Sequence, residues 1–87
     1  MENFMKPIKI KVFYEGGVEK ITAKDSEIPI VSEGLSFIQF LYFIFSSYPE
    51  IQQKFPPGKL GLLLNGKSPA DHDILNDNDE VRLIGVR

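Results

Sequence analysis

One segment limits the possible folds of this 87-residue chain more than any other. Residues 35–45 read LSFIQFLYFIF and are followed by Ser46, Ser47, Tyr48 and Pro49. The run is too long for a typical strand, and a proline just beyond it is a common end of a helix. It is also much shorter than the roughly 20 residues that a membrane-spanning helix needs. The segment therefore predicts one helix that buries an apolar face against a sheet.

The apolar positions of this predicted helix cover more than one face. On a helical wheel they fill an arc of roughly 220°, whereas packing against a single core needs only about 100°. The surplus residues are Phe37, Phe40 and Ile44, which we expect to form a second apolar face. Two explanations stay open. Either the flanking segments 24–34 and 49–57 cover this face, or it contacts another protein, as exposed apolar patches often do.

The residues before the helix predict a β-hairpin. Residues 7–14 (PIKIKVFY) alternate β-branched and other side chains with period two, which is typical of a half-buried strand. Gly16 and Gly17 follow, and glycines can adopt the positive φ angles of a tight turn. Residues 18–23 (VEKITA) continue the alternation, so we expect them to form the returning strand.

The rest of the chain predicts short elements separated by prolines, glycines and acidic residues. Before the long helix lies an irregular link at 24–34, with Ile28 and Ile30 under the edge of the core. After it we expect a further helical turn at 50–55, a strand buried on both faces at 59–64, and an Asn65-Gly66 turn into a short strand at 67–68. An acidic loop at 71–79, anchored by Ile74 and Leu75 and closed by turns at Asp77 and Asp79, then leads into a last strand at 80–86.

This order of elements, β-β-α-β-β-β, predicts an α+β fold. A chain of this length forms one domain, residues 1–87. Its single helix can bury its apolar stripe only by crossing one face of a mixed sheet. The first and last strands would then lie side by side and parallel in the middle of that sheet, which is the ubiquitin-like β-grasp arrangement.

The alternation of the first and last strands also predicts what the far face of the sheet carries. One set of side chains points toward the helix: Ile8, Ile10, Val12, Val81 and Leu83. The other set then points outward together: Lys9, Lys11, Phe13, Arg82 and Ile84. This outer face is expected to be basic with apolar residues at its centre. It is either an ordinary solvated face or a docking surface for an acidic partner.

Three stretches resemble one protein family over nearly the whole chain. They are the apolar helix that closes on Tyr48-Pro49-Glu50, the segment 62–67 (LLLNGK) and the segment 74–81 (ILNDNDEV). Together they are similar to the small subunit of molybdopterin synthase, the thiamine-pathway sulfur carrier and the ubiquitin-related modifiers. The resemblance implies a non-catalytic carrier whose C-terminal carboxylate is adenylated by an activating enzyme, becomes a thiocarboxylate, and delivers sulfur inside a larger catalytic subunit.

On this resemblance the C-terminal residues Gly85, Val86 and Arg87 form the carrier tail. Carriers of this kind end in Gly-Gly, because a tail without side chains can thread a narrow channel. This chain carries Gly85-Val86-Arg87 there instead, so we do not expect it to donate sulfur as it stands. A second function therefore stays open: an interaction module with the same fold and no thiocarboxylate chemistry.

Composition narrows the function classes further. Ten Lys and Arg against twelve Asp and Glu give a net charge of −2, whereas nucleic-acid binders usually carry a basic excess. With no cysteine and one histidine, His72, the chain has no thiolate zinc site, cysteine nucleophile or two-histidine metal site. We therefore expect no metal, no cofactor and no catalytic site. The N-terminal residues do not resemble a signal peptide, so a cytoplasmic protein with no membrane partner is expected.

Overall fold

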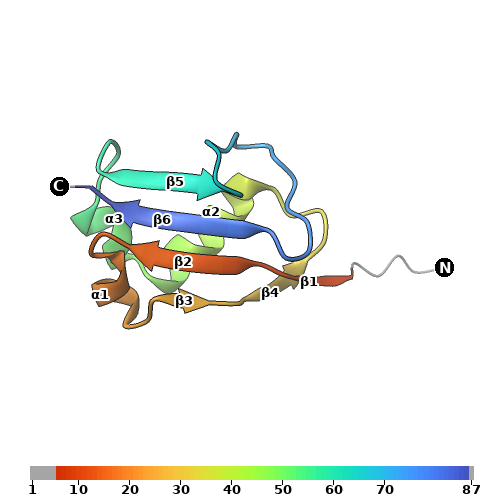
Figure 1. The fold of residues 1–87 in the computed structure, drawn as a ribbon, viewed down its shortest axis with the longest axis horizontal. Helices are drawn as coiled ribbons and strands as arrows, with labels where there is room; N and C mark the ends of the chain where they lie inside the picture. Colours follow the sequence, from red (N-terminus) through yellow and green to blue (C-terminus); the bar gives the residue numbers. More distant parts are fainter. Residues whose placement is uncertain (1–5, 87) are drawn as a thin grey trace.

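The computed structural model describes residues 6–86, which form two small sheets and three helices. The elements are β1 (Pro7–Lys9), β2 (Lys11–Glu15), α1 (Val18–Thr22), β3 (Ser26–Glu27), β4 (Ile30–Ser32), α2 (Phe37–Ser47), α3 (Glu50–Lys54), β5 (Leu60–Leu64) and β6 (Glu80–Gly85). The main sheet has the order β3-β2-β6-β5, and β1 pairs with β4 in a two-stranded sheet (Figure 1). The predicted last strand and the helical turn after the long helix are both confirmed.

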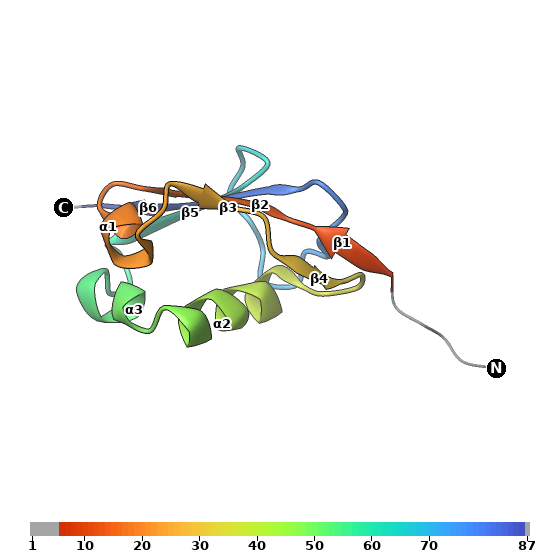
Figure 2. The same ribbon diagram turned by 90° about the horizontal axis from the view of Figure 1, so that it is seen from below.

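The predicted centre of the sheet is confirmed. Strands β2 and β6 pair in parallel, with Val12 opposite Val81 and Tyr14 opposite Leu83. Edge strands β3 and β5 pair antiparallel with β2 and β6. All the helices of the described region lie on one side of the main sheet, which leaves its other face uncovered by any of them (Figure 2). The five residues predicted to point inward are indeed buried: Ile8, Ile10, Val12, Val81 and Leu83.

Helix α2 is confirmed, but its second apolar face is not. The Ser36 side chain and backbone and the Gln39 side chain and backbone form a reciprocal capping box at its start. Phe37, Phe40 and Ile44 are 1%, 0% and 1% exposed, so the expected second face is wrong. These residues belong to the core stripe with Leu41, at the i, i+3, i+4, i+7 spacing of one helix face.

The apolar side chains that α2 leaves in solvent are different ones. Tyr42 and Phe43 are 69% and 46% exposed. The width of the apolar arc is explained by what surrounds α2 on the core side. Val18 of α1, Ile51 of α3 and Leu75 of the acidic loop belong to the same core cluster as the buried residues of α2, so several elements contribute to this core.

The predicted returning strand at residues 18–23 is wrong, because residues 18–22 form helix α1. Gly17 precedes it with φ 109°, a conformation available to glycine, and the Gly17 N–H donates to Glu19 Oε1 at 2.9 Å. Buried Val18 and Thr22 are four residues apart, which is helical spacing. The strand that returns along β2 is β3, where Ser26 pairs with Phe13.

Three smaller expectations also change. The link 24–34 contains β3 and β4, and Ile28 and Ile30 are 58% and 65% exposed instead of packed under the core. Strand β5 is an edge strand with half-buried residues throughout, instead of a strand buried on both faces. The Asn65-Gly66 turn is present, with φ angles of 51° and 81°, but pairing stops after one bridge between Leu64 and Lys67, so no strand forms at 67–68.

No helix within residues 6–86 has the length and apolar character needed to cross a bilayer.

Candidate functional site

The outer face of the main sheet carries two rows of side chains across β2, β6 and β5. In the first row Phe13 lies opposite Arg82, which lies opposite Leu63. In the second row Glu15 lies opposite Ile84, which lies opposite Gly61. All of these residues are half-buried although no helix covers them. The predicted grouping of Phe13, Arg82 and Ile84 on one face is confirmed, and Lys11 lies on the same face opposite Glu80.

The expected positive charge of this face is wrong. The Arg82 guanidinium lies 4.4 Å from the Phe13 ring centroid and forms an ion pair with Glu15. Lys11 is matched by Glu80 on the neighbouring strand. The face is therefore balanced in charge and has an apolar strip of Phe13, Leu63 and Ile84. Glu80 shares the alternation of Arg82 and Ile84, and Glu15 that of Phe13, so both were overlooked, Glu15 because the first strand was expected to end at Tyr14.

Lys9 does not belong to this face. It lies in β1, which pairs with β4 in the other sheet, where Lys9 is opposite Ile30. Its backbone N–H donates to Asp77 Oδ1 at 2.7 Å. The break between β1 and β2 at Ile10 separates Lys9 from the main sheet, and the uninterrupted alternation of residues 7–14 did not indicate it.

The C-terminal end of β6 is packed into the fold. A Cβ added at Gly85 would lie 2.5 Å from Gly16 O and 2.5 Å from Phe55 Cε1, closer than real Cβ atoms come. The Val86 N–H donates to Lys59 O at 2.8 Å, so sheet-like bonding continues past the strand. Gly85 is therefore packed tightly into the fold, whereas the resemblance implied that it belongs to the carrier tail. Val86 is 46% exposed, and Arg87 lies outside the described residues.

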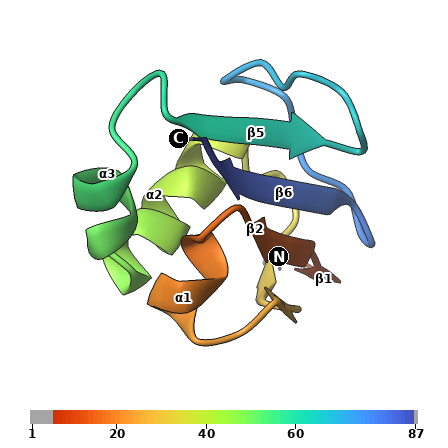
Figure 3. The ribbon, with the colours of Figure 1, turned by 60° about the vertical axis from the view of Figure 1, so that its left-hand side comes forward.

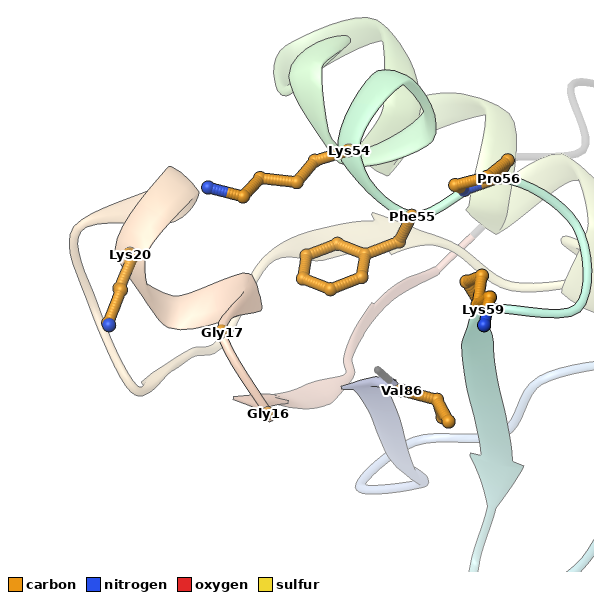
Figure 4. A pocket seen from close by; sticks show the side chains of 8 residues that line it. All are labelled: Gly16, Gly17, Lys20, Lys54, Phe55, Pro56, Lys59 and Val86. Carbon is orange, nitrogen blue, oxygen red and sulfur yellow. The ribbon is translucent and has the colours of Figure 1, made fainter.

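A pocket of about 420 Å³ opens beside this end of β6. Figure 3 shows α1, α3 and the end of β6 gathered at the same end of the molecule. The lining residues come from these elements and the segments next to them: Gly16, Gly17, Lys20, Lys54, Phe55, Pro56, Lys59 and Val86 (Figure 4). Sequence reasoning missed this pocket, because it interpreted Gly16 and Gly17 as a hairpin turn and placed no helix after them.

A polar cluster joins β2, β3 and the end of α2. The buried Tyr14 hydroxyl and the Tyr48 hydroxyl both donate to Glu27 Oε2, the latter at 3.0 Å, and Lys24 Nζ lies 3.4 Å from Glu27 Oε1. Burial, and next the bond to Glu27, raises the pKa of Tyr14 above its usual value. Partial burial acts to raise the pKa of Glu27, but the two tyrosine hydroxyls and Lys24 outweigh it and hold that pKa below its usual value.

This cluster predicts a pH-dependent loss of stability in the variant Glu27→Gln. A carboxylate with a lowered folded-state pKa stabilises the fold above its unfolded-state value of about 4.3, and this contribution is lost as the pH falls through the folded-state value. At pH 7 we expect the variant to lose roughly 1–2 kcal/mol, because charge-assisted bonds become neutral ones. Urea unfolding of both proteins should show this gap narrowing below about pH 4. A gap that is the same at every pH would mean that the charge of Glu27 is not what stabilises the cluster.

The acidic side chains of the loop at 71–79 form hydrogen bonds that stabilise its turns. Asp79 Oδ2 accepts from the Asn76 N–H at 2.8 Å and Asp79 Oδ1 accepts from Asn65 Nδ2 at 3.0 Å, which confirms the predicted role of Asp79. Asp77 instead binds the backbone of Lys9 and so ties the loop to β1. Leu75 is buried as predicted, but Ile74 is 54% exposed. His72 is exposed, and residues 6–86 contain no cluster of three metal-ligating side chains.

Comparison with known proteins found similarity at the level of structure. No family model and no curated protein matches the sequence. A Pyrococcus furiosus protein assigned as molybdopterin converting factor, subunit 1, superposes with a TM-score of 0.81 at 17% identity, over 92% of this chain and 99% of that one. The small archaeal modifier protein 1 of Haloferax volcanii gives 0.76 at 13% identity, over 92% and 99% of the two chains. The protein of the same name from Methanosarcina acetivorans gives 0.74 at 16%, over 93% and 95%.

These superpositions cover nearly the whole of each chain. Because the sequence identities are low, the superpositions show similarity of fold only. They agree with the helix across one face of the mixed sheet and with the parallel central pair of strands. The chain therefore has the ubiquitin-like β-grasp fold.

Proposed function

We propose that this protein is a ubiquitin-like carrier or modifier, a non-catalytic protein that partner proteins hold by its outer sheet face while they act on its C-terminal end. The observation that carries this proposal is the geometry of β6. Its outward side chains, Arg82 and Ile84, form the middle of the half-apolar outer face, and the same strand leads directly to exposed Val86. A partner bound on that face would therefore have the C-terminal end within reach.

The structural neighbours support two more specific forms of this function. One neighbour is described as a molybdopterin converting factor subunit and others as small archaeal modifier proteins. The form that we favour is a sulfur-carrier subunit in molybdopterin biosynthesis, with a larger catalytic subunit and an adenylating enzyme as its partners, in which Gly85-Val86-Arg87 stands where such carriers have Gly-Gly. In that chemistry ATP converts the terminal carboxylate to an acyl-adenylate with release of pyrophosphate. A sulfide donor then displaces AMP and leaves a thiocarboxylate.

One observation favours the alternative, an interaction module without thiocarboxylate chemistry. Gly85 is locked between Gly16 and Phe55, and Val86 is hydrogen-bonded to Lys59, so neither residue extends freely from the sheet. A carrier tail must leave the fold to enter a partner's site, which here would require that these contacts open first. The interaction module would use the outer face alone.

The test of the proposed function is the intact mass of the full-length protein after incubation with the adenylating enzyme of its own organism, ATP and a sulfide donor. A carrier gains the mass difference between one sulfur and one oxygen. In the variant Phe13→Asp we expect the rate of this gain to fall at least about tenfold, because a charge would interrupt the apolar strip. The matched control is Ile30→Asp, which adds the same charge at a residue 65% exposed in the other sheet, and it should react normally.

The two functions differ in their outcomes. A mass gain that depends on Phe13 supports the carrier and its docking face. If the mass stays unchanged while the wild-type protein, but not Phe13→Asp, still binds the enzyme, the interaction module is the better description. Equal reaction of both variants would remove the outer face from the proposal.

A further inference from the structure

The pocket beside the C-terminal end combines an apolar floor with a basic rim. The Phe55 ring lies at its centre, and Pro56 and Val86 add further apolar surface (Figure 4). Lys54 and Lys59 flank the Phe55-Pro56 pair along the chain, and Lys20 stands on α1 at the outer side. The three lysines are all exposed, and Phe55 is 8% exposed. A volume of about 420 Å³ lies within the usual range of roughly 300–1,000 Å³ for binding pockets.

The charge of the pocket differs from that of the protein as a whole. The chain carries a net charge of −2, yet three lysines and no acidic residue line the pocket. Within residues 6–86 the ion pairs are Lys24–Glu27 and Arg82–Glu15, and neither involves a pocket lysine. The nearby carboxylate of Glu19 accepts a hydrogen bond from the Gly17 N–H. Among the described residues no carboxylate forms an ion pair with a pocket lysine, and Glu50, which borders the adjoining hollow with Lys20 and Lys54, is not part of the lining of this pocket.

Close packing of glycines fixes the shape of this site. Gly16 and Gly85 approach each other so closely that a Cβ on either would collide with the backbone of the other. A Cβ on Gly17 would lie 3.1 Å from Phe55 Cζ. The end of β6 is therefore held against the Phe55 ring, and Val86 becomes part of the pocket wall. Because Val86 belongs both to the C-terminal end and to the pocket wall, a protein bound to this end would lie beside the pocket.

We propose that this pocket binds an acidic segment of the partner protein, in which an apolar side chain enters against Phe55 and flanking carboxylates pair with Lys54 and Lys59. The proposal deepens the proposed function, since it states the chemistry of a partner that acts at the C-terminal end. Charge complementarity supports this occupant, because a basic rim on an acidic protein attracts acidic groups selectively. The apolar floor favours a peptide side chain over a small inorganic anion. Such an anion would cover Phe55, Pro56 and Val86 but has no apolar surface to pack against them.

The test uses a synthetic peptide with the sequence Asp-Glu-Leu-Phe-Asp-Glu, capped at both ends, and the full-length ¹⁵N-labelled protein. We expect the largest amide chemical-shift changes at the pocket, at Gly16, Gly17, Phe55, Lys59 and Val86. The double variant Lys54→Glu/Lys59→Glu should bind the acidic peptide at least about tenfold more weakly than the wild-type protein does. The neutral peptide Asn-Gln-Leu-Phe-Asn-Gln should also bind more weakly. Raising the salt concentration should weaken binding of the acidic peptide, because the lysines are exposed.

The matched control is Lys6→Glu/Lys67→Glu, which makes the same change of net charge at exposed lysines outside the pocket. This control should keep wild-type affinity within about twofold. Shift changes spread over all lysines, or equal weakening by both double variants, would overturn the proposal. Because no adenylating enzyme takes part, peptide binding can succeed when thiocarboxylate formation fails, and the reverse, so the two proposals fail separately.

Discussion

The variant Phe40→Ala should lose about 3–5 kcal/mol of unfolding free energy. Phe40 is 0% exposed and lies in the core cluster with Leu41 and Ile44 on α2 and Val18 on α1. Truncating it removes a buried ring and leaves a cavity that the surrounding side chains fill only in part. A domain of this size is typically stable by roughly 4–13 kcal/mol, so the variant should be close to unfolding at room temperature. Urea unfolding followed by circular dichroism measures the difference.

Phe43→Ala is the matched control on the same helix. Phe43 is 46% exposed, and its ring centroid lies 6.2 Å from that of Phe40. We expect a loss below about 1 kcal/mol, because little area is removed from the core and the exposed side chain is already hydrated. If Phe43→Ala destabilised the protein as much as Phe40→Ala, the side of α2 that faces the core would be assigned incorrectly.

These two phenylalanines also show why the helix was predictable and its orientation was not. The apolar run and Pro49 limited residues 35–45 to a helix whatever surrounded it. Nearly every turn of that run offers an apolar residue on several sides, so the pattern alone does not choose between Phe40 and Phe43. The choice depends on the rest of the core, to which Val18, Ile51 and Leu75 contribute from other parts of the chain.

The centre of the sheet was predictable for the opposite reason. Ile8, Ile10 and Val12 alternate with charged or half-buried residues, and a strand has only two faces, so the pattern leaves one solution. The alternation failed at residues 18–22, where five residues fit both a strand and one turn and a half of helix. The helix is favoured over the strand by Gly17 at φ 109° and by the burial of both Val18 and Thr22, which lie on the same side of the helix.

The pocket and the pairing of Glu15 with Arg82 could not be found in this way. Lys54 and Lys59 lie near Val86 because the end of β6 pairs with the start of β5. Glu15 reaches Arg82 because β2 and β6 are in one particular parallel register. Neither arrangement leaves a local signal, since the residues that meet are separated by 27 to 67 positions in the chain.

Gly85→Ala should be the most damaging small substitution at the C-terminal end. Its new Cβ would meet the Gly16 carbonyl oxygen and the Phe55 ring at 2.5 Å, and the first of these is backbone that cannot rotate away. Over-packing of this kind costs about 1–3 kcal/mol, and we expect the upper part of that range because two contacts are involved. Hydrogen exchange at the Val86 amide should also become faster, because the end of β6 must move away from its bond to Lys59 O.

Gly61→Ala is the control that isolates this effect. Gly61 lies opposite Ile84 in the neighbouring strand β5, and a Cβ there would meet Ile84 O at 3.5 Å and Ile84 Cβ at 3.6 Å, which are ordinary contacts. Replacing a glycine without strain restricts the unfolded chain, so this variant should be unchanged or more stable by about 0.4–1 kcal/mol. If both variants lost the same stability, glycine flexibility in the sheet would be responsible. A loss confined to Gly85→Ala would show that close packing of β6 against Gly16 and Phe55 holds the C-terminal end in place.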